Sequence, residues 1–244
     1  MSRTAVYTAL VLRNRLSGES NSEITLLTAE EGIIRATVFG GPKSKLRAYA
    51  MPYNSGRVWI YRDKAKDYRK LSDFDVHSWR PGLRELYERT MAAGAIIQTI
   101  LSSHGGGGDW PTALKLAVET LDTLDGANEE LSERLLVHFL WRWAHFLGIQ
   151  PNLENCVSCG KDTSSSTILF NVHEGGALCA ECANNSQLQK INPGCLRWLS
   201  AVGTSEPALV YRYSMDNKSL NEAKSLATAI LSGTLGKRLE VCNW

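Results

Sequence analysis

The sequence lacks an apolar run long enough to cross a membrane. Its most apolar stretch, residues 135–147, is interrupted by His138, Arg142 and His145, whereas a spanning helix needs about 20 mainly apolar residues. The first residues lead into an alternating segment and have neither the apolar core nor the cleavage pattern of a secretory signal. We therefore expect a cytoplasmic protein with no membrane partner and with reduced thiols, because disulfides need an oxidising compartment.

The sequence also lacks the motifs of common catalytic sites. A glycine run at residues 105–108 has neither the Lys-Ser/Thr that completes a Walker loop nor a preceding strand, so it predicts a flexible loop. A zinc hydrolase would need an HExxH helix and a zinc deaminase an HxE…PCxxC arrangement, and neither occurs. We expect no enzymatic activity.

Only six cysteines occur in 244 residues, and four of them form two close pairs. Cys156 and Cys159 make one CxxC motif, Cys179 and Cys182 make the other, and nineteen residues separate the motifs. Two such pairs supply four soft ligands for a closed tetrahedral Zn²⁺ site, which would be structural because no position remains for water or substrate. The alternatives are two disulfides or two redox motifs, but a thioredoxin-type motif would need a surrounding βαβ unit.

The residues around these motifs predict a zinc ribbon. Residues 168–172 and 177–179 have the composition of two short strands, with two glycines in the turn between them. His173 offers an alternative ligand, although a solvated hairpin histidine is the commoner case. Cys195 and Cys242 are isolated in the sequence, and we expect them to be reduced thiols.

The net charge of +2 conceals a concentration of positive charge near the start of the chain. Residues 35–70 contain ten Lys and Arg against two Asp. Such an excess attracts polyanions, most commonly nucleic acid, and the alternative is a solvated basic face without a partner. The candidate phosphate contacts are Arg35, Lys43, Lys45, Arg47, Arg57, Arg62, Lys64, Lys66, Arg69 and Lys70.

The first eighty residues predict five strands. These strands cover residues 6–12, 23–28, 32–39, 57–62 and 68–79. Five short strands predict a small antiparallel barrel, and an OB-fold is the five-stranded barrel most often found with a basic, aromatic face, although an SH3-like barrel also fits the strand count. Alternation places Arg57, Trp59 and Tyr61 on one face of the fourth strand. The two aromatic rings would either stack on bases or fill the barrel core.

After Pro81 the pattern of apolar residues becomes helical. The predicted helices cover residues 83–101, 111–121, 128–147, 193–202 and 219–235. We therefore expect an α+β multidomain protein. It would have an OB-fold nucleic-acid-binding domain at residues 1–80, then a helical domain at residues 81–244 with a four-cysteine zinc ribbon inserted at about residues 154–185.

The third predicted helix carries a dense group of polar and aromatic residues. His138, Trp141, Arg142 and His145 share one face at three- and four-residue spacing. This face would either bind an aromatic or anionic group or pack between neighbouring helices, and packing is the commoner case.

Short motifs follow one another in a characteristic order along the chain. They are Leu12-Arg13, Gly18-Glu19-Ser20, residues 24–28, Glu31-Gly32, Gly40, Lys43-Ser44, residues 146–153 and the two cysteine motifs. In this order they resemble the bacterial RecO family of recombination mediators. One difference lies at residues 40–45, where the family usually carries a more basic run.

The resemblance implies an OB-fold followed by a helical domain with a zinc ribbon, in a protein of DNA repair by homologous recombination. Similar proteins bind single- and double-stranded DNA, anneal complementary strands and act with RecR to load RecA recombinase onto strands covered by single-strand-binding protein. The resemblance would place the chain at the bacterial nucleoid. The residues alone also allow a zinc-stapled protein-interaction adaptor or transcription regulator without a direct annealing role.

Overall fold

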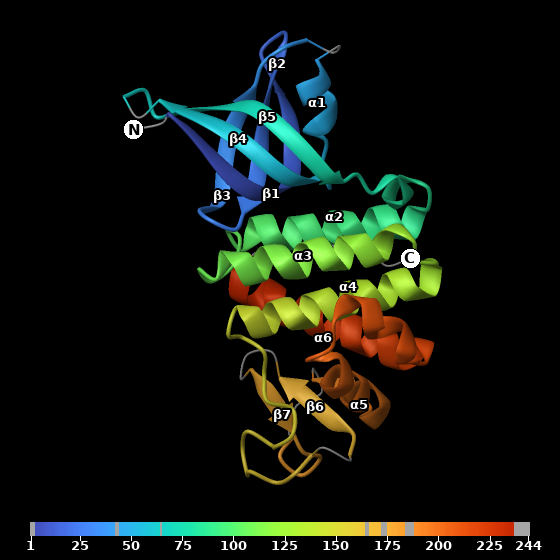
Figure 1. Cartoon of the computed structure of the whole chain (residues 1–244). Helices are drawn as coiled ribbons and strands as arrows, with labels where there is room; N and C mark the ends of the chain where they lie inside the picture. The colour runs from blue at the N-terminus through green and yellow to red at the C-terminus, as the bar shows by residue number, and fades with distance from the viewer. Residues whose placement is uncertain are drawn as a thin grey trace.

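The structure, a computed structural model, describes residues 3–41, 44–63, 65–163, 166–171, 175–183 and 188–236. A β-barrel is followed by a group of helices, and a small sheet lies on the far side of the helices from the barrel (Figure 1). This arrangement confirms the predicted α+β class. Within the described ranges, no helix combines the length and the apolar character that crossing a membrane requires.

The first part is a closed barrel of five strands. The strands are β1 (Thr4–Ser17), β2 (Asn21–Thr28), β3 (Gly32–Val38), β4 (Ser55–Asp63) and β5 (Tyr68–Ser78). They close in the order β1-β2-β3-β5-β4, and only the β3–β5 pair is parallel. A short helix, α1 (Lys45–Tyr49), lies between β3 and β4. A five-stranded barrel of this order is an OB-fold, so the SH3-like alternative is excluded.

The barrel is filled by one face of each strand. Val58, Ile60, Leu71 and Phe74 are examples of this inner set, and all four are buried. Strand β1 is buried on both faces near its centre, because Leu10 and Leu12 point outward into the core of the helical part. The outer face of β1 and β2 is therefore the side on which the helices pack.

The helical part is built around one central helix. Its elements are η1 (Pro81–Arg84), α2 (Tyr87–Ser102), α3 (Trp110–Asp125), α4 (Glu129–Phe146), α5 (Pro193–Val202), η2 (Pro207–Arg212) and α6 (Asn217–Leu235). Helix α4 contacts α2, α3, α5 and α6. Four helices begin at a side chain that accepts a backbone N–H, which satisfies a donor that the helix leaves free. These caps are Asp109, Asn128, Asn192 and Asp216.

The glycine loop after α2 differs from the predicted flexible loop, because it is packed. Gly105 lies against Leu27 and Ile33 of the barrel. A Cβ on Gly106 would lie 2.1 Å from Phe146 Cε1, and both glycines have positive φ. Glycine is required where the barrel, α2 and α4 meet this closely.

The small sheet has three strands in the order β7-β6-β8. The strands β6 (Ile168–Asn171) and β7 (Gly176–Leu178) confirm the two predicted ones, whereas β8 (Gln189–Ile191) was not predicted and lies beyond the expected end of the ribbon. Ile168, Phe170 and Ile191 belong to the core of the helical part. The ribbon is therefore attached to the helices through shared apolar contacts.

Candidate functional site

Strand β4 directs its aromatic residues outward. Val58 and Ile60 lie in the barrel core, so Arg57, Trp59 and Tyr61 lie on the outer face. Arg57 is exposed, and the two rings are half-buried. This confirms the predicted alternation and excludes the alternative in which the two rings fill the barrel core.

The pairing of β4 with β5 places charges of both signs on this outer face. Directly opposite residues of an antiparallel pair share a face. Arg57 pairs with Asp75 and Trp59 with Asp73, so two carboxylates flank one half of the face. Tyr61 instead pairs with Lys70, and the next pair on this face is Asp63 with Tyr68. Both halves of the face are therefore mixed in charge, with Lys70 as the cation directly opposite Tyr61.

From Tyr61 and Lys70, a row of cations and rings continues across the barrel. Lys70 Nζ lies 5.3 Å above the ring of Phe39, and Phe39 packs edge-on against Tyr68. On the other side, Arg3 Nη1 donates to Tyr61 Oη at 3.4 Å. Sequence reasoning missed Arg3, Phe39 and Tyr68. Phe39 continues the outward alternation of Arg35, which was the available signal. Rings beside cations are the elements of a surface that binds single strands.

Other predicted cations lie elsewhere on the barrel. Arg35 is exposed on the outer face of β3, Lys45 and Arg47 lie on α1, and Lys66 is exposed in the β4–β5 hairpin. None of these four forms an ion pair within the described part of the chain. They are available to an external anion. Lys43 and Lys64 lie outside the described residues.

Arg62 and Arg69 differ from the other predicted cations, because both already hold a carboxylate. Arg62 Nη1 lies 3.0 Å from Glu31 Oε1, and Arg69 Nη2 lies 2.9 Å from Glu31 Oε2. Tyr7 Oη donates to Glu31 Oε1 at 2.7 Å. Burial acts to raise the pKa of Glu31, but the Tyr7 hydroxyl and the two guanidinium groups outweigh it and hold the pKa below its usual value. Glu31 therefore carries a negative charge at neutral pH.

The four cysteines of the two CxxC motifs come together beside the small sheet. Their Sγ atoms all lie within 4.8 Å of one another, and Cys159 and Cys179 are 3.8 Å apart. A tetrahedral Zn²⁺ with Zn–S bonds of about 2.3 Å places its sulfurs about 3.8 Å apart. Backbone N–H groups of Cys179 and Cys159 lower the pKa of Cys156 to about 6, whereas hydrogen bonding with the Cys159 thiol raises the pKa of Cys182 to about 12. The group can hold a metal ion.

Cys195 lies apart from this cluster. Cys195 is buried in α5, and burial raises the pKa of its thiol to about 12. It is a free thiol, as predicted. His173 and Cys242 lie outside the described residues. A surface ion pair of 2.8 Å between Lys161 and Glu181 joins the two cysteine motifs.

Packing explains the group of polar and aromatic side chains on one face of α4. His138 is fully buried, and its Nε2 donates to the Ser205 carbonyl at 3.0 Å. Arg142 Nη1 donates to the same carbonyl at 3.3 Å. Trp141 is also buried. These contacts tie α4 to the segment between α5 and η2, so the face serves the helical core.

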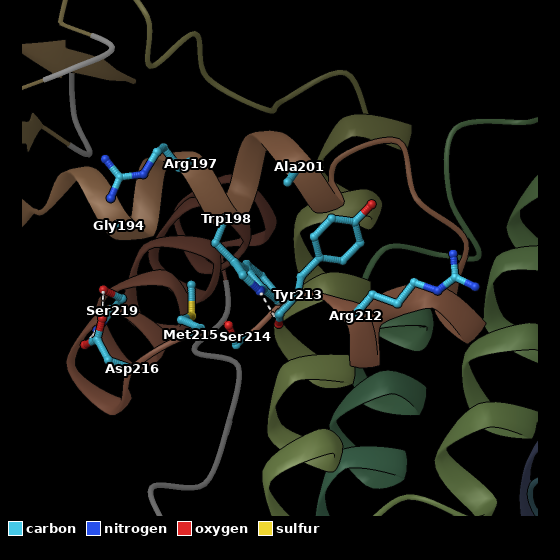
Figure 2. Close-up of a pocket in the computed structure, with 10 residues that line it drawn as sticks. All are labelled: Gly194, Arg197, Trp198, Ala201, Arg212, Tyr213, Ser214, Met215, Asp216 and Ser219. Carbon is cyan, nitrogen blue, oxygen red and sulfur yellow. Dashed lines mark hydrogen bonds between the residues drawn. The ribbon is translucent and has the colours of Figure 1, made fainter.

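A groove that the sequence did not predict lies between α5 and the segment that joins η2 to α6 (Figure 2). It encloses about 690 Å³, and Trp198, whose Nε1 donates to the Tyr213 carbonyl at 3.2 Å, lines it with Met215. Arg197 and Arg212 extend on opposite sides of it. The lining mixes apolar side chains with polar ones, among them the two arginines and the Asp216 carboxylate, and it suits a ligand that combines apolar and polar groups. The only sequence signal was the mixture of aromatic and basic residues at 211–213.

Comparison with known proteins gives two family matches that together span most of the chain. The model described as "Recombination protein O N terminal" matches residues 1–79, and "Recombination protein O C terminal" matches residues 84–241. Three similar proteins are each named "DNA repair protein RecO". The one from Desulfitobacterium hafniense is 27% identical over 194 residues, which are 79% of this chain and 68% of that protein. The one from Syntrophomonas wolfei is 28% identical over 221 residues, with coverages of 88% and 84%. The one from Alkaliphilus metalliredigens is 30% identical over 179 residues, with coverages of 70% and 69%.

Proposed function

Because this chain belongs to the RecO family of DNA repair proteins, we propose that it is a non-enzymatic, DNA-binding mediator of recombination. In this role it binds single- and double-stranded DNA, anneals complementary strands and assists the loading of a recombinase. The observation that supports the proposal best is the row of cations and rings on the outer face of the barrel, centred on Tyr61 and Lys70.

The proposed mechanism is electrostatic. Lysines and arginines of the barrel neutralise phosphates and release counterions, while exposed rings accept stacked bases. Two strands held on such a surface repel each other less, so annealing would need no ATP. The proposed contacts are Arg35, Lys43, Lys45, Arg47, Arg57, Trp59, Tyr61, Arg62, Lys64, Lys66, Arg69 and Lys70.

The four clustered cysteines are proposed to hold a structural Zn²⁺. Their soft donors and their mutual distances fit this ion. When bound, the ion would cross-link the two CxxC motifs at one end of the small sheet. The cysteines would thereby stabilise the ribbon against the helices and take no part in chemistry.

The proposed partners follow from the family. They are a RecR-type mediator protein, single-strand-binding protein and, indirectly, RecA recombinase, in the cytoplasm at the nucleoid. The groove between Arg197 and Arg212 favours a second candidate function, that of a protein-interaction adaptor, because its mixed apolar and polar lining suits a segment of a partner protein.

The test is a fluorescence-anisotropy titration of labelled single-stranded DNA at several salt concentrations. The wild-type protein should bind with little sequence preference and a steep salt dependence. Charge reversal of Lys43, Lys45 and Arg47 to Glu should weaken binding and make the dependence of log K on log salt shallower, by about 0.7 for each phosphate that the variant no longer neutralises. Charge reversal of Lys115 and Lys218, which are exposed on α3 and α6, is the control. No binding by the wild type at low salt would favour the adaptor.

A further inference from the structure

Glu31 lies between two arginines at one end of the barrel. It belongs to the turn between β2 and β3, whereas Arg62 is the second-last residue of β4 and Arg69 the second residue of β5. Each of its carboxylate oxygens faces one guanidinium, at 3.0 and 2.9 Å, and the Tyr7 hydroxyl donates to the first of them. We call this group of four side chains the barrel mouth.

The barrel mouth has the geometry of a phosphate site. A phosphodiester carries two non-bridging oxygens, and arginine binds carboxylate and phosphate through the same kind of charge-assisted hydrogen bond. Two guanidinium groups and one hydroxyl therefore surround the Glu31 carboxylate, and a phosphate can bind in its place. Exchange of one anion for the other conserves both ion pairs.

The barrel mouth is open to solvent and adjoins the proposed DNA surface. The side chains of Arg62, Arg69 and Glu31 are 38%, 20% and 33% exposed. In the β4–β5 register, the pair of Arg62 and Arg69 follows Tyr61 and Lys70, but it points to the opposite face of the strands, at the end of the barrel interior. A DNA strand that follows the row of rings and crosses the rim of the barrel would bring a phosphate to these arginines.

We propose that the barrel mouth is a phosphate-binding subsite that the Glu31 carboxylate fills in the free protein. A DNA phosphate binds Arg62 and Arg69 only by displacing Glu31, so Glu31 lowers the affinity of the protein for DNA. It also prevents weakly bound anions from pairing with these two arginines. An anion that also engages the neighbouring row supplies the free energy for the displacement, whereas an isolated phosphate does not. The inference rests on the proposed function, because it assumes that the barrel binds DNA.

The experiment compares Glu31→Gln with Glu30→Gln in the same anisotropy titration. Both changes remove one negative charge from the same turn, but the Glu30 carboxylate accepts the Thr8 backbone N–H and contacts no arginine in the described structure. We expect Glu31→Gln to bind single-stranded DNA about three- to tenfold more tightly. Its dependence of log K on log salt should be steeper by about 0.7 to 1.4, because one or two additional phosphates are neutralised. Glu30→Gln should stay near the wild type.

Further variants connect the gain to the arginines. Replacing Arg62 and Arg69 by Gln in the Glu31→Gln background should return both affinity and salt dependence to about the wild-type values. Glu31→Asp keeps the charge but shortens the side chain, and it should give a smaller gain. This variant decides the matter if Glu31→Gln does not fold.

The outcomes separate this inference from the proposed function. Absence of wild-type binding at low salt would overturn both. Wild-type binding with equal gains in Glu31→Gln and Glu30→Gln would leave the DNA-binding function in place but overturn the subsite, since net charge alone would then explain the effect. Unchanged affinity in folded Glu31→Gln and Glu31→Asp would also overturn it.

Discussion

Arg80 Nε donates a hydrogen bond to Asp122 Oδ1 at 2.8 Å, across the junction between the barrel and α3. The same guanidinium donates to the Tyr53 carbonyl and to Ser55 Oγ, on the barrel side of the junction. The side chain of Arg80 is only 2% exposed. One buried cation thus connects three segments at the point where the strands end and the helices begin.

Replacement of Asp122 by Ala should destabilise the protein by about 2 kcal/mol. A buried charge that loses its partner typically costs about 3–5 kcal/mol, but Arg80 keeps two other acceptors and the Asp122 side chain is 47% exposed. Urea unfolding at pH 7 measures the change. Glu119→Ala on the same helix, which removes an exposed pair with Lys115, should cost less than about 0.5 kcal/mol. Equal losses in the two variants would refute the structural role of the Arg80–Asp122 pair.

Features that depend on residues close together along the chain could be predicted from the sequence. Alternation in β4 separated Val58 and Ile60 from Trp59 and Tyr61, because a strand directs successive side chains to opposite faces. The spacing of the two CxxC motifs was enough to predict the cluster of four thiols. Stop and start signals such as Asn128 placed the helices to within a few residues.

Features that depend on distant pairing were not predictable. The contacts of Glu31 with Arg62 and Arg69 join residues 31 and 38 positions apart. The register of β4 and β5 shifts at an irregularity between Trp59 and Ile60, so no residue count would have placed Asp73 beside Trp59. Strand β8 has three residues and α1 has five, which is too short for a periodic pattern to identify them.

This register leads to a prediction about affinity. Replacing Asp73 and Asp75 by Asn should raise affinity for single-stranded DNA by about two- to fivefold at low salt, because exposed charges beside a phosphate each contribute a fraction of a kcal/mol. The anisotropy titration measures the change, and the gain should shrink as salt increases. Asp109→Asn at the start of α3, away from the barrel face, serves as the control. A decrease in affinity would show that DNA does not lie along this half of the face.

The cysteine cluster gives a prediction about metal content. The purified protein should contain about one zinc per chain, and Cys179→Ser should lose it because three thiolates and one hydroxyl bind zinc weakly. Atomic absorption on the purified variants measures this. Cys195→Ser changes a buried cysteine outside the cluster and should keep the metal. Wild-type protein that was purified without chelators and lacked metal would contradict the structural Zn²⁺.

The buried histidine of α4 gives a prediction about pH. Burial lowers the pKa of His138 to about 4, with the nearby Arg142 acting in the same direction and the hydrogen bond to Ser205 acting against it. In the unfolded chain the pKa is about 6.5. Between these two values the unfolded state binds a proton that the folded state does not. The free energy of unfolding should therefore decrease as the pH falls from about 6.5 to about 4, by about 3 kcal/mol from this residue.

Urea unfolding at pH 7, 5.5 and 4.5 tests this expectation, with His138→Gln as the variant. A glutamine amide can still donate to the Ser205 carbonyl but does not titrate, so the variant should lose less stability than the wild type over this range. Cysteine protonation and metal loss affect both proteins alike and cancel in the difference. His145→Gln, whose ring bonds to Gln150 at the surface, should retain the wild-type slope. A His138→Gln slope equal to that of the wild type would contradict the prediction, because His138 would then bind a proton as readily in the folded protein as in the unfolded chain.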